Sequence, residues 1–152
     1  MSIEIRRASP PDLDALAPMF DAYRQFYEQR ADAARARGFI AARLEAADSV
    51  ILLALIDGRP AGFAQLFPSF SSVRTGLLWI LNDLYVAGDC RQRGVGRALL
   101  SACVAHGEQT GAVGLQLETQ RTNNVAQALY VEQGWEMDEE FCSFHYPLEN
   151  HR

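Results

Sequence analysis

The chain has 152 residues, 49% of them hydrophobic, and a formal net charge of −5 at pH 7, with 14 arginines and no lysine. This length is typical of one domain and the apolar content suffices for one core, so we expect a single domain over residues 1–152. The acidic balance argues against a nucleic-acid-binding protein held by phosphate contacts and favours a cationic substrate.

The sequence contains no segment typical of a membrane span or a secretion signal. Its longest apolar stretches, such as SVILLALI at 49–56, are far shorter than the ~20 residues that cross a bilayer. The N-terminus lacks a basic segment followed by an apolar run. Three cysteines, Cys90, Cys103 and Cys142, form no close pair, which indicates neither a disulfide framework nor a metal site. We therefore expect a soluble, cytoplasmic protein with reduced thiols and no bound metal.

The N-terminal third predicts one strand and two helices. Residues 3–8 alternate apolar and polar side chains as a half-buried strand does, and SPPD then starts a helix with Ser9 as its cap. A second helical stretch, rich in Ala and Arg, is expected over about 32–46. The first helix has an apolar stripe at 3.6-residue spacing, formed by Leu13, Leu16, Phe20, Tyr23 and Tyr27.

Three strands are expected next. The stretches 49–56 and 61–67 predict a hairpin around the turn DGRP, with Pro68 closing its second strand. A Ser-rich loop then leads into a long strand over 77–87. Strict alternation, interrupted by Asn82, gives this strand two faces, with Leu78, Ile80, Leu84 and Val86 on one and Trp79, Leu81, Asp83 and Tyr85 on the other.

The remaining chain predicts a helix from about Gly94 to Gln109, a strand over 112–119, a helix over 123–133, and strands around 135–137 and 140–147. This order predicts a mixed α/β sheet of about seven strands with helices on both faces. The last strand is aromatic on both sides, which suggests a homodimer contact, although burial within one chain explains it nearly as well.

The sequence CRQRGVGRALL joins the long strand to the following helix and has the composition of a phosphate-binding loop. Gly94 and Gly96 leave the backbone accessible, and the first N–H groups of the helix point at an anion. Arg91, Arg93 and Arg97 add positive charge suited to phosphate oxygens. We interpret the stretch as a diphosphate cradle; an ordinary helix start with solvated arginines is the alternative.

The stretch lacks the signatures of ATP and NAD sites. It contains no GK[ST], which excludes a P-loop, and Leu99 stands where a dinucleotide fingerprint requires its third glycine. Gln116 and Glu118 fall near the distance at which an NAD-dependent oxidoreductase places its acidic residue, but the missing glycine argues against that class.

A second group of residues lies about 30 positions later, on the helix NNVAQALYVEQ. Asn123, Ala126, Gln127 and Tyr130 lie close to one face of this helix. A phenol of ordinary pKa near ~10 is suited to protonating a departing thiolate. Alternatively, Asn123 is a simple helix cap and Tyr130 a core aromatic.

The two groups together resemble the GNAT superfamily of acetyl-CoA-dependent N-acetyltransferases. The family pattern R/Q-x-x-G-x-G/A is matched by Arg91, Gly94 and Gly96. The pattern N-x-x-A-x-x-L-Y and the closing G-W are matched by Asn123, Ala126, Leu129, Tyr130, Gly134 and Trp135. The resemblance implies a mostly antiparallel sheet with a splayed central parallel pair, and a direct transfer in a ternary complex without an acyl-enzyme.

The resemblance also assigns residues to acetyl-CoA and to proton transfer. It places pantetheine along Leu84, Tyr85 and Val86, the diphosphate on Arg91, Gln92, Arg93, Gly94, Val95, Gly96, Arg97 and Ala98, and further contacts on Asn123, Ala126 and Tyr130. Tyr130 is the expected proton donor. The segments FPSFSS and DLYV resemble the polyamine and thialysine acetyltransferase branch, in which an acidic residue precedes the strand aspartate. Here that position is Asn82, so Asp83 is the candidate base; a strand carboxylate bonded to nearby backbone is the alternative.

The expected acceptor is the primary amine of a small molecule, peptide or protein. Aromatic and acidic side chains attract an ammonium group, and we predict that Tyr23, Tyr27, Phe70 and Asp83 bind it. The alternative is that the aromatic stripe belongs to the core, which is the more frequent role of Tyr and Phe at helical spacing. A non-catalytic module that binds acetyl-CoA as a sensor or interaction partner is the alternative function.

Overall fold

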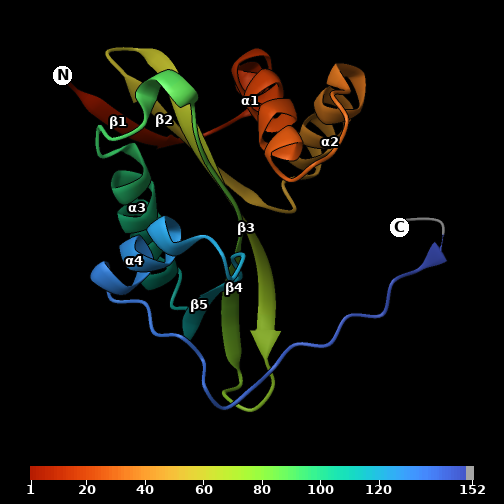
Figure 1. Ribbon diagram of the computed structural model, residues 1–152, viewed down its shortest axis with the longest axis vertical. Helices are drawn as coiled ribbons and strands as arrows, with labels where there is room; N and C mark the ends of the chain where they lie inside the picture. Colours follow the sequence, from red (N-terminus) through yellow and green to blue (C-terminus); the bar gives the residue numbers. More distant parts are fainter. Residues whose placement is uncertain (150–152) are drawn as a thin grey trace. The chain divides into compact units, whose positions relative to one another are not determined.

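The computed structural model describes residues 1–149. Residue contacts divide the chain into two compact units, Met1–Glu118 and Thr119–Arg152. The first unit contains a mixed sheet with the strand order β1-β2-β3-β4-β5, and it confirms the predicted α/β class (Figure 1). Its strands are β1 (Ile3–Arg7), β2 (Val50–Ile56), β3 (Arg59–Ser71), β4 (Gly76–Val86) and β5 (Gly114–Leu117).

The sheet is mostly antiparallel, as expected. β1, β2, β3 and β4 pair antiparallel in chain order, and β5 pairs parallel with β4. This parallel pair lies at the edge of the sheet among the described residues, whereas the sequence led us to expect it at the centre.

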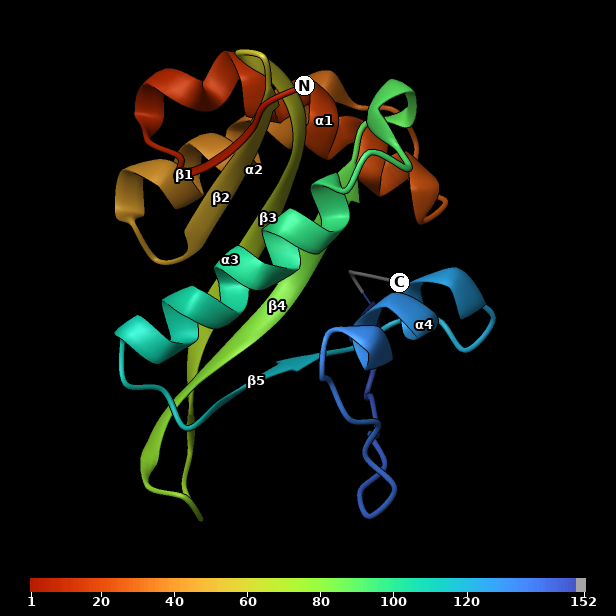
Figure 2. The ribbon, with the colours of Figure 1, turned by 90° about the vertical axis from the view of Figure 1, so that its left-hand side faces the viewer.

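Helices cover both faces of the sheet in the first unit. The short helix η1 (Pro10–Asp12) leads into α1 (Leu13–Phe26), which packs with α2 (Ala33–Ala46) on one face (Figure 1). After the short helix η2 (Gly88–Cys90), α3 (Val95–Gln109) lies against the other face (Figure 2). These helices follow the predicted ranges closely, because their amphipathic spacing and caps are local features of the sequence.

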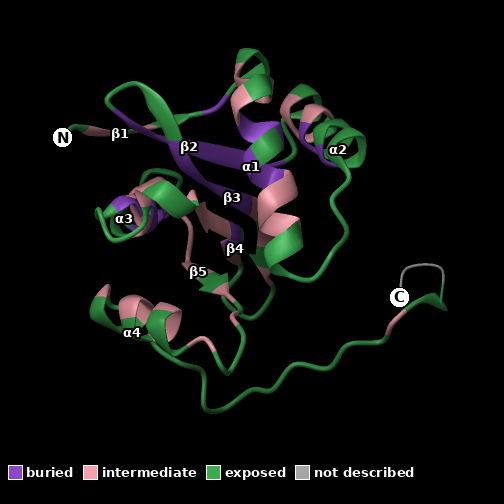
Figure 3. Cartoon of the chain, turned by 45° about the horizontal axis from the view of Figure 1, so that its top comes forward, coloured by how far each residue is buried: buried purple, intermediate pink, exposed green. Residues whose placement is uncertain are grey.

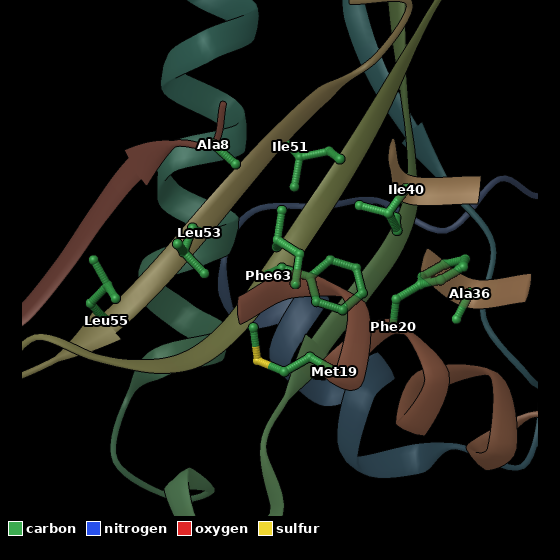
Figure 4. Packing of buried hydrophobic residues seen from close by; sticks show 10 residues of the cluster. Ala8, Met19, Phe20, Ala36, Ile40, Ile51, Leu53, Leu55 and Phe63 are labelled. Carbon is green, nitrogen blue, oxygen red and sulfur yellow. The ribbon is translucent and has the colours of Figure 1, made fainter. Parts of the chain in front are cut away.

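The core of this unit lies between the sheet and its helices. Every residue of β2 is buried, because helices cover both of its faces (Figure 3). Ile51 and Leu53 of β2 and Phe63 of β3 pack against Phe20 of α1 and Ile40 of α2 (Figure 4). Burial of each such side chain contributes roughly 1.5–3 kcal/mol.

The expected end of β3 at Pro68 is wrong. β3 continues to Ser71, and Pro68 pairs with Trp79 of β4. The pairing of β3 with β2 stops at Leu66, so Pro68 lies in a part of the strand with one unpaired edge. Within sheets, proline is largely confined to such edge positions because it has no N–H to donate to a neighbouring strand.

The second unit contains α4 (Asn124–Glu132), none of whose residues is buried. The strands expected around 135–137 and 140–147 are not formed, so the described residues contain five strands and not about seven. The aromatic residues Phe141, Phe144 and Tyr146 are 78%, 94% and 86% exposed. Their pattern suits a strand covered on both sides, but in residues 1–149 no backbone ladder pairs with them.

Candidate active site

A β-bulge in β4 shapes the region around Asp83. Gln65 of β3 opposes Asp83, whereas the next residue, Leu66, opposes Leu81, so Asn82 is the extra residue. An extra residue reverses which face of the sheet each later side chain points to. Side chains after Asn82 therefore lie on the opposite face from the one that strict alternation predicts.

The predicted shared face of Trp79, Leu81, Asp83 and Tyr85 is accordingly wrong. Before the bulge, Trp79 faces α3, and its Nε1 donates a hydrogen bond to Oγ1 of Thr110 at 2.9 Å. After the bulge, the ring of Tyr85 lies 6.4 Å from that of Tyr23 on α1. The bulge thus directs Asp83 and Tyr85 toward α1 and α2.

The carboxylate of Asp83 is buried and hydrogen-bonded on both oxygens. Nε2 of Gln65 donates to Oδ2 of Asp83 at 2.5 Å, and Nδ2 of Asn82 donates to Oδ1 at 3.1 Å. Gln65 in turn accepts a hydrogen bond at its Oε1 from Oγ of Ser49 at 2.8 Å. The hydroxyl of Tyr23 donates to the backbone carbonyl of Asn82 at 3.2 Å.

Burial controls the ionisation of this group. Removal from water raises the pKa of Asp83 above its ordinary value, and hydrogen bonds from Gln65, Tyr23 and Asn82 partly oppose that rise. The pKa of Tyr27 is also raised, first by burial and then by the negative charge of Asp83. Asp83 is therefore a carboxyl whose proton affinity is set by its surroundings, a feature common at catalytic sites.

Three of the four predicted acceptor-binding residues lie together. The rings of Tyr23 and Tyr27 are 5.1 Å apart in an edge-to-face arrangement. A hydrogen bond from Tyr23 lowers the pKa of Asp83, and the charge of Asp83 raises the pKa of Tyr27. Phe70 does not join this group, because it opposes Leu77 toward the other end of β4 and is 76% exposed. The structure thus gathers Tyr23, Tyr27 and Asp83 and leaves Phe70 apart.

The backbone of β4 beyond the bulge forms an edge without a strand partner on the β5 side. Pairing with β5 ends at Leu81 and Leu117 within the described chain, and β4 continues to Val86. The predicted pantetheine-binding residues Leu84 and Tyr85 lie on this edge. An extended ligand that carries amides can pair with such an edge as a strand does.

The segment after β4 turns directly into the start of α3. Gly94 is the N-cap and has a left-handed backbone, with φ of 86°, and Gln92 has φ of 64°. A Cβ at Gly94 would meet no atom within 4 Å, so space remains beside the backbone. The first helical N–H groups, at Val95 and Gly96, have no acceptor within their own helix. This geometry suits an anion.

The predicted diphosphate-binding side chains surround this helix start. Arg91, Arg93 and Arg97 are exposed, and Nε of Arg91 donates to the backbone carbonyl of Val86 at 3.3 Å. That bond holds Arg91 beside the end of β4. The donor set consists of N–H groups and guanidinium groups, which is the chemistry that a diphosphate requires.

In the second unit, α4 carries the other predicted residues. Oδ1 of Asn123 accepts a hydrogen bond from the N–H of Ala126 at 3.2 Å, so Asn123 is the N-cap of α4. The ring of Tyr130 lies 6.2 Å from that of Trp135. Gly134 follows the helix with φ of 95°, a conformation that favours glycine.

The sequence analysis missed Ser49 and Gln65. Both are buried, with 7% and 0% of their surfaces exposed. The available signal was a single polar residue within the apolar stretch AGFAQLF, because a buried amide needs hydrogen-bond partners.

The described residues contain neither a metal-binding cluster nor a membrane-spanning helix. Nowhere in residues 1–149 do three His, Cys, Asp or Glu side chains converge as a metal site would require. None of the helices in this range combines the length and hydrophobicity needed to span a bilayer.

The chain is similar to proteins named as acetyltransferases along nearly its whole length. A model of the acetyltransferase (GNAT) family matches residues 14–135. An uncharacterized N-acetyltransferase, YhfO of Bacillus subtilis (strain 168), is 44% identical over 146 residues, which cover 96% of this chain and 97% of YhfO.

Solved structures give the same result. A crystal structure of a probable acetyltransferase superposes with a TM-score of 0.91 at 40% identity and covers 95% of this chain and 97% of that one. A ribosomal-protein-alanine N-acetyltransferase from Brucella melitensis biovar Abortus 2308 has a TM-score of 0.80 at 20% identity, covering 97% and 100% of the two chains, and shows the fold alone. On the family match and the 44% identity, this chain belongs to the GNAT family of acetyltransferases.

Proposed function

We propose that this protein transfers the acetyl group of acetyl-CoA to the primary amine of a small molecule, by direct attack of the amine in a ternary complex. The observation that carries the proposal is the junction of β4 and α3. There an unpaired strand edge leads into a glycine-capped helix start surrounded by arginines. Coenzyme A has its parts in the matching order. Its extended arm carries two amides, which suit the strand edge, and this arm is joined to a diphosphate, which suits the helix start.

The binding roles follow from this match. The backbone of Leu84, Tyr85 and Val86 would pair with the amide-bearing arm, and the segment 91–98 would hold the diphosphate. On α4, the family pattern assigns Asn123 and Ala126 to the same ligand. Acetyl-CoA supplies an activated acetyl thioester.

On the acceptor side, Asp83 takes the proton that an amine must lose. An amine of pKa near ~10 is almost wholly protonated at pH 7, so a base is required before the nitrogen attacks. The raised pKa of Asp83 brings its proton affinity closer to that needed, and the rings of Tyr23 and Tyr27 favour an approaching cation.

Tyr130 gives its hydroxyl proton to the departing sulfur.

Because the amine attacks the thioester directly, no cysteine is needed as a nucleophile. The burial of the cysteine on α3 supports this view. Cys103 of α3 is fully buried, and burial raises the pKa of its thiol to about 12. Such a thiol is protonated at neutral pH and is a poor nucleophile.

The proposal is tested in two steps. Calorimetry should show acetyl-CoA binding to the unchanged protein and at least tenfold weaker binding to Gly96→Glu, because a carboxylate at the helix start repels a diphosphate. Release of free CoA thiol should then follow with some member of a panel of polyamines, amino acids, aminosugars and peptides with N-terminal alanine. The peptides are included because the Brucella protein, which has the same fold, is named as a ribosomal-protein-alanine N-acetyltransferase. Tight binding without thiol release for any acceptor would instead indicate a non-catalytic sensor, and equal binding to Gly96→Glu would refute the cradle.

A further inference from the structure

Three buried polar side chains form one hydrogen-bonded chain across neighbouring strands. Ser49 precedes β2, Gln65 lies on β3 and Asp83 lies on β4, with 7%, 0% and 5% of their surfaces exposed. Among residues 1–149, these three are the polar or charged residues that are buried. Burying such groups costs free energy unless they are paired, and each one here is paired with the next.

The chain of hydrogen bonds has a fixed direction. Oε1 of Gln65 accepts from the hydroxyl of Ser49, so its Nε2 faces Asp83 and can only donate. A flipped Gln65 amide would place its oxygen against the carboxylate, where two oxygens repel each other. The carboxylate thus selects the orientation in which Nε2 donates to Oδ2, and the hydroxyl of Ser49 holds the amide in that orientation by donating to Oε1.

The two oxygens of Asp83 consequently differ. Oδ2 faces the wholly buried Gln65, while Oδ1 faces Asn82, which is exposed. An exposed amide can move aside for a ligand or a water molecule, whereas a buried one cannot. Oδ1 is thus the oxygen whose hydrogen-bond partner belongs to an exposed residue.

We propose that Gln65, oriented by Ser49, is a positioning residue that holds Oδ2 of Asp83 as an acceptor and leaves Oδ1 to take the proton of the acceptor amine. The inference rests on the proposed function, because it assumes that Asp83 is the base of that reaction. Neither Gln65 nor Ser49 need touch the amine. Gln65 is also the last residue before the register shift, so the same hydrogen bond joins β3 to β4 at the bulge.

The electrostatic surroundings of Asp83 make this hydrogen bond influential. The polar groups that face it are Gln65 from β3, Tyr23 and Tyr27 from α1, and Asn82 from its own strand. No arginine or histidine of the described chain contributes to its pKa. Burial raises that pKa and the donor of Gln65 opposes the rise, so removing the donor must raise it further.

The test compares four variants of the full chain. Gln65→Met keeps the length of the side chain without its donor, and Ser49→Ala removes only the orienting hydroxyl. Ser49→Thr restores a hydroxyl and serves as rescue. Leu66→Met is the matched control, because it alters the neighbouring residue of β3 on the other face of the sheet.

Two readouts are needed. Carbon NMR of the Asp83 carboxyl should show its pKa raised by about one unit in Gln65→Met, less in Ser49→Ala, and unchanged in Ser49→Thr and Leu66→Met. The acid limb of the pH profile of kcat/KM, measured with an accepted amine, should move upward by the same amounts.

An unchanged Asp83 pKa in both Gln65→Met and Ser49→Ala would overturn the positioning role. If Gln65→Met fails to fold, Ser49→Ala alone decides, since it removes a single atom. A shifted pKa with an unmoved acid limb would overturn the base role of Asp83. That result is distinct from failure of the proposed function as a whole, in which no amine is acetylated although the NMR shift is observed.

Discussion

Asn82 and Asp83 are neighbours in the chain and occupy opposite environments. Asn82 is exposed, whereas Asp83 is 5% exposed and hydrogen-bonded to the buried Gln65. Successive side chains of a strand point to opposite faces, and the extra residue in β4 directs the face that carries Asp83 toward α1 and α2. At the scale of single residues, the bulge decides which polar group lies next to the rings of Tyr23 and Tyr27.

The acceptor group could be predicted in part from the sequence. Tyr23 and Tyr27 follow a 3.6-residue period and therefore share a helix face, and a single carboxylate in an apolar strand was a candidate base. Phe70 shares their chemistry but not their location. Its distance from Asp83 depends on the register of β3 and β4, which local patterns do not encode.

The role of Tyr130 can be tested at this scale. Tyr130→Phe should lower kcat by at least ~10-fold, because general acid catalysis contributes about 10²–10⁴ in rate. The dissociation constant of acetyl-CoA should change little, since a single hydroxyl is lost. Steady-state kinetics and calorimetry together separate the two effects. Tyr146→Phe is the control, as Tyr146 is 86% exposed in the same unit; an unaltered kcat in Tyr130→Phe would remove the acid role.

At the scale of elements, α3 starts at a residue whose backbone conformation favours glycine. Gly94 is an N-cap with φ of 86°, a region that costs other residues roughly 1–2 kcal/mol. The same glycine leaves the helix start open beside the arginines. Local stability and ligand access thus depend on the same position.

Gly94→Ala should therefore destabilise the protein by about 1 kcal/mol, as measured by urea denaturation. Gly38 gives a matched control with the opposite sign. It lies inside α2, a Cβ there would meet nothing within 4 Å, and Gly38→Ala should stabilise by about 0.5–1 kcal/mol. If both substitutions changed the free energy of unfolding by the same amount, a side chain at Gly94 would not strain the backbone.

The start of α1 depends on Asp12. Its carboxylate accepts hydrogen bonds from Arg6 at 2.9 and 2.7 Å and from the N–H of Ser9 at 2.9 Å. The Arg6 hydrogen bond is the largest cause that lowers the pKa of Asp12 to about 2. The short helix η1, which leads into α1, is thus joined to β1 by an ion pair and has a hydrogen bond between Asp12 and its N-cap Ser9.

Asp12→Asn should cost about 1 kcal/mol at pH 7, a value that allows for the solvent around Arg6. Because the pKa is lowered in the folded state, this stabilisation is complete above pH 3.8 and is lost as the pH falls toward about 2. Urea denaturation at pH 7 measures the cost of the substitution, and the same experiment at pH 2.5 measures how much of that cost is lost. Asp14→Asn is the control, since Asp14 is 87% exposed in its ion pair with Arg37. A difference between wild type and Asp12→Asn that is as large at pH 2.5 as at pH 7 would contradict the ion-pair argument.

At the scale of the molecule, Asp12 and Asp83 give opposite pH dependences of stability. The folded state raises the pKa of Asp83, so it binds more protons than the unfolded state above the ordinary value of 3.8. The contribution of Asp83 to stability is therefore largest below pH 3.8 and declines as the pH rises through the folded pKa. The stabilisation by Asp12 varies with pH only below pH 3.8, so the two pH dependences occupy separate windows.

Asp83→Asn should remove the decline in stability that Asp83 causes as the pH rises. Relative to this variant, the wild-type protein should lose unfolding free energy between pH 4 and neutral pH, as measured by urea denaturation at intervals of one pH unit. Asp12→Asn should leave that slope unchanged. A constant difference between wild type and Asp83→Asn across this range would show that burial does not raise the pKa of Asp83.

The sequence by itself determined the family, the helices and the β4–α3 junction of this protein. Those features depend on residues close together in the chain, such as Gly94 and Gly96, or on a helical period. The tertiary structure alone decided the bulge at Asn82, the union of Ser49 and Gln65 with Asp83, and the absence of strands between 135 and 149. Each of these depends on which segments pair across the sheet, and pairing register joins residues whose separation in sequence leaves no local signal.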